Sequence, residues 1–170
     1  MKLRLAIVLT PLLIFLAIKP SPSLSKTSDT SPREIAANFK QMRETSACRG
    51  CRFIGVVLHG KSFDGIDLTG ASFFRSSLLK SSFSFAKLEG ANFQKTGLYG
   101  ADFTSARLRG ANFNGANLRQ SRFNQSSLIN VNFSGANLAD ADLMGAATEG
   151  AVIDSGTTLS GTRFPDGNYR

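Results

Sequence analysis

The sequence predicts a solenoid, a fold in which short repeated units stack into a tube, and three regularities predict it. A large apolar residue, Phe or Leu, stands at every fifth position from 53 to 143. A small or short side chain, mostly Ala, Ser or Thr, stands two positions before each of these from residue 71 on. Phe and Leu also alternate without a break up to Leu138, which is a second period of ten. A spacing of five fits neither an amphipathic helix nor an alternating strand, and units this short bury their apolar residues only by stacking.

The quintets resemble a known repeat. Ala91 to Lys95, Ala116 to Gln120 and Ala136 to Asp140 read A-N-F-Q-K, A-N-L-R-Q and A-N-L-A-D, similar to the A-(N/D)-L-x-x motif of pentapeptide-repeat proteins. The resemblance covers roughly residues 46–155. It implies an all-β solenoid, a right-handed quadrilateral β-helix with four quintets per coil. A coil of 20 residues would place Phe53, Phe73, Phe93, Phe113 and Phe133 in one column and Phe63, Phe83, Phe103 and Phe123 in the column opposite, with Leu in the two between.

Residues 1–25 resemble a secretory signal peptide. A basic start at Lys2 and Arg4 precedes an apolar run at residues 5–18, and small residues at Ser23 and Ser25 allow cleavage after Ser25. The run is shorter than the roughly 20 residues that span a bilayer, so an uncleaved membrane anchor is the less favoured alternative. We therefore expect export and no stable membrane insertion after cleavage. The layout also resembles exported pentapeptide-repeat proteins of cyanobacteria, which implies the periplasm or thylakoid lumen, or secretion.

Both ends of the repeat array carry signs of caps. Residues 26–31 form a polar linker that we expect to be mobile, and Ser31-Pro32-Arg33-Glu34 is a capping box that predicts a helix at 32–45. Ile35, Phe39 and Met42 would share one face of this helix and cover the open first coil. The pattern decays after residue 143, with Thr148 and Ile153 at central positions and a break in phase at 157–159, so residues 156–170 are expected to form an irregular cap. Leu159 and Phe164 would plug the last coil.

Cys48 and Cys51 are the two cysteines of the chain, and both positions point toward the tube axis in repeat phase. We favour a structural disulfide between the helix exit and the first turn, because the chain is expected to be exported. Two reduced, buried cysteines and a redox-active Cys-x-x-Cys remain alternatives. A zinc site is not supported, because two cysteines and the lone His59 do not supply four ligands.

The outer surface suggests a partner-binding strip. Positions 59, 79, 99 and 119 form one outer line and lie near two apolar residues of the adjoining column; the strip consists of Ile54, His59, Phe74, Leu79, Tyr99 and Arg119. Scattered exposed apolar residues that bind nothing are the alternative interpretation. Charged side chains should also pair between coils, Arg122 with Asp102 and Asp142, and Asp67 with Lys87.

The sequence favours a non-catalytic interaction scaffold with an unknown protein partner. No acid–base pair, nucleophile with a base, metal set or phosphate loop is recognisable, so we expect no catalytic, metal or cofactor-binding residues. A DNA-mimic topoisomerase inhibitor, known within the family, is disfavoured because the chain has a net charge of +8 and is expected to be exported. Nucleic-acid binding is also not expected, because Lys and Arg are dispersed over the tube. Oligomeric state is open.

Overall fold

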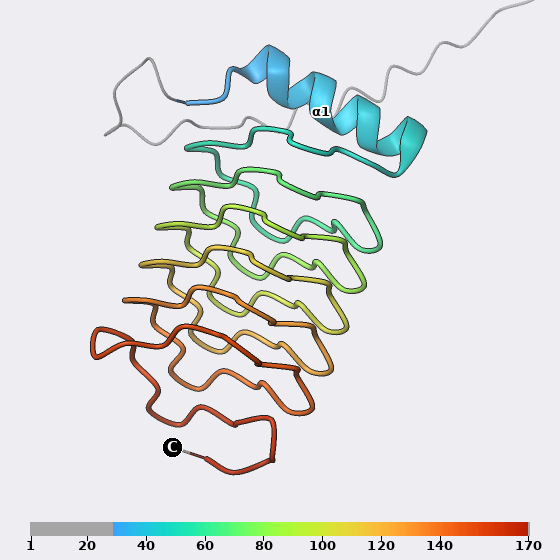
Figure 1. The fold of residues 1–170 in the computed structure, drawn as a ribbon. Helices are drawn as coiled ribbons and strands as arrows, with labels where there is room; N and C mark the ends of the chain where they lie inside the picture. The colour runs from blue at the N-terminus through green and yellow to red at the C-terminus, as the bar shows by residue number, and fades with distance from the viewer. Residues whose placement is uncertain (1–28, 170) are drawn as a thin grey trace, which may run out of the picture.

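Parallel backbone pairing with a constant offset of 20 residues defines the fold. In the structure, a computed structural model that describes residues 29–169, single-residue bridges run from Ala47 with Asp67 through Asn132 with Val152 at this offset. Each bridge is isolated, so within these residues the sides of the tube are stacks of one-residue pairs. The chain winds into a tube with a helix across its N-terminal end and the C-terminus at the other end (Figure 1). The predicted signal peptide and residues 26–28 of the predicted linker lie outside the described residues.

Each coil has four bridge positions five residues apart, which confirms the predicted four quintets per coil. The four sides of the tube are called walls here, named by their central residues. Wall 1 is centred on residues 48, 68, 88, 108 and 128; wall 2 on 53, 73, 93, 113 and 133; wall 3 on 58, 78, 98, 118 and 138; and wall 4 on 63, 83, 103, 123 and 143.

The corners between walls turn the chain through a left-handed backbone conformation. Glycine stands at many of them, such as Gly90 with φ of 65°, and non-glycine corners such as Lys80 and Lys95 hold φ of 55° and 56°. The side chain before a central residue supports the turn: Asn92 and Asn112 each accept a bond from the backbone N–H two residues on, at 2.9 and 3.0 Å. These bonds confirm the predicted turn role of Asn and Asp.

The core is the filled interior of the tube. All large residues from Phe53 to Leu143 at the repeat spacing are at most 2% exposed. Phe73 and Phe93 stack with ring centroids 5.0 Å apart and planes 4° from parallel, as predicted for neighbouring coils. Phe93 also meets Phe103 of the other column edge to face at 5.6 Å. The two Phe columns therefore contact each other across the axis, which leaves the aliphatic Leu columns to fill the remaining sides.

Helix α1 (Pro32–Thr45) closes the N-terminal end of the tube (Figure 1). Ser31 caps it by accepting a bond from the Glu34 N–H at 3.2 Å, and the helix has the bounds that its capping pattern predicted. The helix lays an apolar face on the first coil; Ile35 and Met42 are buried, and the ring of Phe39 lies 5.9 Å from Phe53 and 6.2 Å from Phe63.

The expected mobility of the linker is wrong at Thr30. This residue is 5% exposed, its N–H donates to the Ile54 carbonyl at 2.9 Å, and its hydroxyl accepts from the Ile54 N–H at 2.7 Å. Ile54 belongs to the first coil, which has no coil above it to pair its backbone. Thr30 therefore supplies the missing pairing, which explains why this part of the linker is fixed.

The C-terminal end is more regular than the irregular cap that the sequence predicted for 156–170. One residue is inserted between Val152, which pairs at an offset of 20, and Thr158, which pairs with Asn137 at an offset of 21. Pairing continues to Arg163, so Leu159 and Phe164 follow the bridge positions of the final turn and are half-buried. Ile153 stands at a central position but is 42% exposed, because no further coil covers it.

Candidate interaction surface

Over the described residues, the central side chains of all four walls pack against one another and fill the interior of the tube. Among residues 29–169, no group of three or more His, Cys, Asp or Glu is placed to hold a metal ion. The described part of the chain also contains no helix with the length and apolar character needed to cross a membrane. Functional features must therefore be sought on the outside of the tube.

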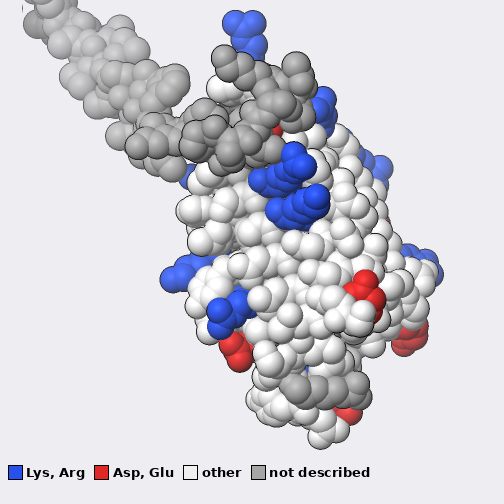
Figure 2. All heavy atoms as spheres, turned by 90° about the vertical axis from the view of Figure 1, so that its left-hand side faces the viewer, with Lys and Arg blue, Asp and Glu red and all other residues white. Residues whose placement is uncertain are grey.

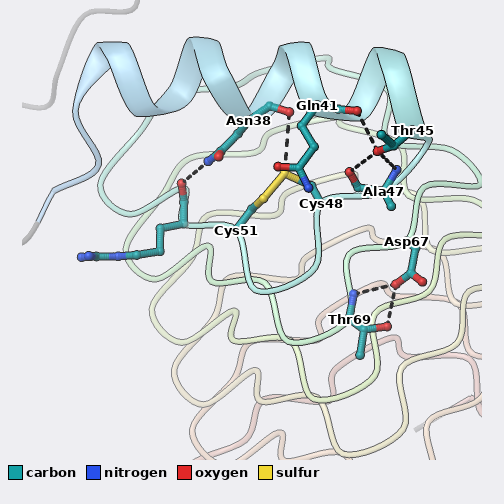
Figure 3. The surroundings of a disulfide bond; sticks show 9 residues. Asn38, Gln41, Thr45, Ala47, Cys48, Cys51, Asp67 and Thr69 are labelled. Atoms are coloured by element: carbon teal, nitrogen blue, oxygen red, sulfur yellow. Dashed lines mark hydrogen bonds between the residues drawn. A yellow bond between two sulfur atoms is a disulfide. The ribbon is translucent and has the colours of Figure 1, made fainter.

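Cys48 and Cys51 are joined as a disulfide in the structure, with Cα atoms 5.3 Å apart (Figure 3). Cys48 fills the central position of wall 1 in the first coil and is fully buried, whereas Cys51 lies in the small-residue position of wall 2 and is half-buried. The Cys48 sulfur lies 3.6 Å from the backbone oxygen of Asn38 on α1. The Cys48 sulfur is therefore closed to an attacking thiolate by the helix, whereas Cys51 is half-buried.

Asn38 is a structural residue that the sequence reasoning missed. It is 8% exposed, and its side-chain amide donates to the Arg52 carbonyl at 2.9 Å (Figure 3). The bond satisfies an edge carbonyl of the first coil and fixes the helix on it. The signal was present in the sequence, because residue 38 stands three positions after Ile35 and four before Met42, on the face expected to dock.

The predicted strip lies on walls 2 and 3, as the repeat arithmetic required. Backbone bonds place its members in register: the Lys80 N–H donates to the Tyr99 carbonyl at 2.9 Å, and the Gly60 N–H donates to Leu79 at 2.9 Å. The exposed residues of the strip are His59 and Arg119. The others are half-buried: Ile54, Phe74, Leu79 and Tyr99.

Local contacts hold these side chains flat against the tube. The guanidinium carbon of Arg75 lies 4.8 Å from the centroid of the Phe74 ring. Leu79 extends over Gly97, where a Cβ would meet its Cδ1 at 3.5 Å. The Tyr99 hydroxyl donates to the side-chain carbonyl of Gln120 in the next coil. The strip is therefore an ordered, flush surface without a deep pocket.

Two further strip residues have polar partners in neighbouring coils. The Nε2 atom of His59 lies 2.7 Å from the Ser77 hydroxyl. Arg119 pairs with Asp140 at 3.5 Å, and both side chains are about half exposed at 47% and 51%. These contacts order the ends of the strip and leave both groups accessible to a partner.

Charge pairing on the other walls follows the prediction at one place and departs from it at another. Arg122 forms an ion pair with Asp102, as predicted. The second predicted partner of Arg122, Asp142, pairs with Arg163 instead, at 3.9 Å. Asp67 stacks beside Lys87 of the next coil as predicted, but the expected ion pair between their side chains is not formed. Asp67 pairs with Arg49 at 2.9 Å, because Arg49 reaches it diagonally from the coil above.

The carboxylates on these walls are stabilised in their charged form. Desolvation by burial is the largest single influence on Asp102 and raises its pKa. It is outweighed by the Thr104 hydroxyl and N–H and by Arg122, which together lower the pKa below its ordinary value of 3.8. The pKa of Asp67 is lowered in the same way against desolvation, by Thr69 and Arg49.

Comparisons with known proteins agree with the architecture. The family profile described as "Pentapeptide repeat region" matches residues 76–153. No curated protein matches the chain.

Three solved structures are similar to this chain. A pentapeptide repeat protein from the Arabidopsis thaliana thylakoid lumen shares 34% identity over 61% of this chain and 71% of its own, with a TM-score of 0.58. One from Nostoc Pcc 7120 shares 27% identity over 58% of this chain and 84% of its own, with a TM-score of 0.50. One from the cyanobacterium Cyanothece 51142 shares 26% identity over 73% of this chain and 98% of its own, with a TM-score of 0.40. The repeat pattern, the 20-residue coil, the family profile and the match to the Arabidopsis thaliana protein together show that the chain belongs to the pentapeptide-repeat family.

Proposed function

We propose that this protein is a non-catalytic interaction scaffold that presents a rigid face to a protein partner in an exported compartment. The observation that carries the proposal is the contrast between a filled interior and an ordered apolar strip on walls 2 and 3. The interior of the described tube is filled and encloses no substrate site, whereas a flat face with aromatic residues and Arg has the composition of a protein interface.

Rigidity suits the strip to this role. Each coil is hydrogen bonded to its neighbours through the backbone, for example Leu98 to Asn117 at 2.8 Å and Gly97 to Ser76 at 2.9 Å. A partner that docks on such a wall does not have to order it first, so less of the binding free energy is lost to conformational entropy.

Three features support the exported location. The N-terminal sequence has the pattern of a signal peptide, the two cysteines are placed for a disulfide, and one similar protein comes from the thylakoid lumen. The proposal includes cleavage after Ser25 and an oxidised Cys48–Cys51 pair in the mature protein. The right hand of the coil, implied by the family, belongs to the same proposal.

Affinity capture from the source compartment tests the scaffold function. Leu79→Asp with Tyr99→Asp should abolish recovery of a partner, because two charges then stand in the apolar part of the strip. Phe85→Asp with Ile129→Asp is the matched control, since it adds the same charge at exposed or half-exposed apolar residues of walls 4 and 1. Equal recovery with both double variants would show that the strip is not the site, provided that circular dichroism shows both folded.

The DNA-mimic alternative receives no support from the surface. A mimic of duplex DNA must be anionic to occupy a DNA-binding groove, whereas the chain carries 20 Lys and Arg against 12 Asp and Glu. An inhibition assay of DNA gyrase with the mature protein would decide the matter, and complete inhibition at a one-to-one ratio would overturn the scaffold proposal.

A further inference from the structure

Over the first four coils of the tube, the carboxylates lie on two of the four walls. Over its first four coils, walls 2 and 3 (residues 51–60, 71–80, 91–100 and 111–120) carry five cationic residues and no Asp or Glu. We name this surface the basic side; its cations are Arg52, Arg75, Lys80, Lys95 and Arg119. The other two walls of these coils, at 61–70, 81–90, 101–110 and 121–130, also carry five cations but with four carboxylates. The cations are evenly dispersed, as predicted, and the anions are not.

Ion pairs increase the difference in charge between the two sides of the tube. On walls 1 and 4, Arg107 pairs with Glu89 at 2.8 Å and Arg122 pairs with Asp102, so much of the positive charge there is neutralised between coils. On the basic side, no described carboxylate lies within ion-pair distance of Arg75, Lys80 or Lys95.

Among residues 29–169, the carboxylates of walls 2 and 3 are Asp140 and Asp154, both beyond these four coils. Asp140, in the fifth coil, pairs with Arg119. Asp29 lies at the N-terminal edge, where its carboxylate would touch a Cβ placed on Gly55. Between these edges, Arg75, Lys80 and Lys95 keep their positive charge.

The uncompensated cations stand at corners of the tube. Arg75, Lys80 and Lys95 have φ of 56°, 55° and 56°, in the left-handed conformation that glycine adopts with less strain. In Figure 1, the loop at 153–157, which contains the inserted residue of the last coil, protrudes to the left. Figure 2 shows this left-hand side, so it faces the corner between walls 2 and 3. Lys and Arg lie along its upper and middle coils, and most of the visible Asp and Glu lie lower (Figure 2).

We infer that the basic side binds an extended acidic segment of a partner protein, in which carboxylates alternate with apolar side chains. The inference deepens the proposed scaffold function and rests on it. Its basis is charge complementarity together with the apolar strip, since Phe74, Leu79 and Tyr99 lie between the cations on the same two walls. Carboxylates of the segment would meet the corner cations, and its apolar residues would cover the strip.

The surface fits this occupant better than a membrane or a nucleic acid. A lipid surface is usually held by apolar side chains that enter the bilayer, but Phe74 and Leu79 lie flat and half-buried, and Arg75 covers the ring of Phe74. A nucleic acid is held mainly by phosphate contacts from Lys and Arg, and the cations of the basic side without a described carboxylate partner are Arg75, Lys80 and Lys95.

The length of the segment follows from the spacing of the coils. Four coils at about 4.8 Å span roughly 14 Å between the first and the last, which an extended chain covers in four to five residues at about 3.3 Å each. The segment therefore needs about five residues in contact.

Fluorescence anisotropy with a labelled acidic peptide tests the inference. The probe is a peptide of about ten residues, twice the contact length, in which Asp and Glu alternate with Leu. The mature protein is compared with Lys80→Glu/Lys95→Glu on the basic side. The matched control is Lys61→Glu/Lys87→Glu, which changes the net charge by the same amount on walls 4 and 1. Circular dichroism and thermal melting verify that each variant is folded.

We expect the Lys80/Lys95 variant to bind the peptide at least about tenfold more weakly than the wild type at ionic strength near 0.01 M, and the control variant to change affinity by less than about threefold. Equal weakening in both variants would overturn the inference, because it would reflect net charge alone. No binding to the wild type would also overturn it. Tighter binding to phosphatidylglycerol vesicles or to a single-stranded oligonucleotide than to the peptide would assign the surface to that other class.

The scaffold function and this inference fail in different ways. If affinity capture recovers a partner through the strip but the acidic peptide does not bind, the inference is wrong and the scaffold stands. If capture recovers a partner equally with both double variants, the strip is not the binding site, and if capture recovers no partner at all, the scaffold proposal itself is wrong.

Discussion

Phe93 lies at the middle of the stacked rings, and its replacement by Ala should destabilise the protein severely. The ring is fully buried. It is stacked between Phe73 and Phe113 at 5.0 and 4.8 Å and meets Phe83 and Phe103 edge to face at 5.7 and 5.6 Å. A buried Phe→Ala change costs about 3–5 kcal/mol, and four ring pairs place Phe93 at the upper end of this range. We therefore expect a loss of about 4–5 kcal/mol in the free energy of unfolding.

Phe133 provides the internal comparison. It is also buried, but the rings around it are only Phe113 at 5.5 Å and Phe123 at 6.0 Å. With two fewer ring pairs at about 0.5–1.5 kcal/mol each, Phe133→Ala should cost about 1–3 kcal/mol less than Phe93→Ala. Equilibrium urea unfolding, followed by circular dichroism and by Tyr fluorescence to check that a single transition occurs, measures both. Equal losses for the two variants would refute the argument that ring stacking stabilises the column.

Further outcomes follow from other contacts. Cys48→Ala with Cys51→Ala should lower stability by about 2 kcal/mol or less, because the loop that the disulfide closes is short; mass spectrometry before and after reduction of the exported protein checks that the bond exists. Asn38→Ala should cost about 1–3 kcal/mol by leaving the Arg52 carbonyl unpaired, whereas the exposed Lys40→Ala should change stability by less than about 0.5 kcal/mol. The pKa values of Asp67, Asp102 and Asp154 are lowered in the folded protein, so the unfolded chain takes up protons first as the pH falls. The stability they contribute is full above the ordinary pKa of 3.8 and is lost below it, and Asp102→Asn should flatten the fall in melting temperature on the acid side. Lys80→Gly with Lys95→Gly should raise stability by about 0–1 kcal/mol per residue through relief of left-handed strain; a lower melting temperature would show that these corners are not strained.

The repeat spacing carried most of the fold because two side chains in five, the central residue and the small residue two positions before it, point inward. Once Phe73 and Phe93 stand 20 residues apart in a coil of 20 residues, their stacking follows without any knowledge of the rest of the chain. The capping helix could also be predicted from the sequence, because Ser31 and Pro32 mark its start and the first coil leaves an open end for its apolar face to cover. Local rules and the global fold agree throughout this region, which is why the sequence was sufficient.

The missed features depend on groups that no periodicity marks. Thr30 pairs with Ile54 across 24 residues, and the pairing depends on the edge amides that the first coil leaves open. Both Arg49 and Lys87 lie in coils next to Asp67, and only the diagonal reach of the Arg49 side chain decides which of them forms the ion pair. The positions of the strip residues follow from the 20-residue coil. Their packing against the tube, such as Arg75 over Phe74, depends on side-chain rotamers that the repeat does not determine.

The corner positions connect the stability of the tube with its proposed role. A corner is the place where glycine is most favourable, and glycine is used at Gly60, Gly100 and Gly115 on the borders of the same walls. Lys80 and Lys95 accept left-handed strain at equivalent positions, and neither has a described carboxylate partner that would offset it. Non-glycine corners of the other walls, such as Phe85 and Gln125, hold the same conformation, so the feature that distinguishes Lys80 and Lys95 is their unpaired charge. The inferred acidic partner would compensate this charge, because its carboxylates would pair with ammonium groups that the tube itself leaves unpaired.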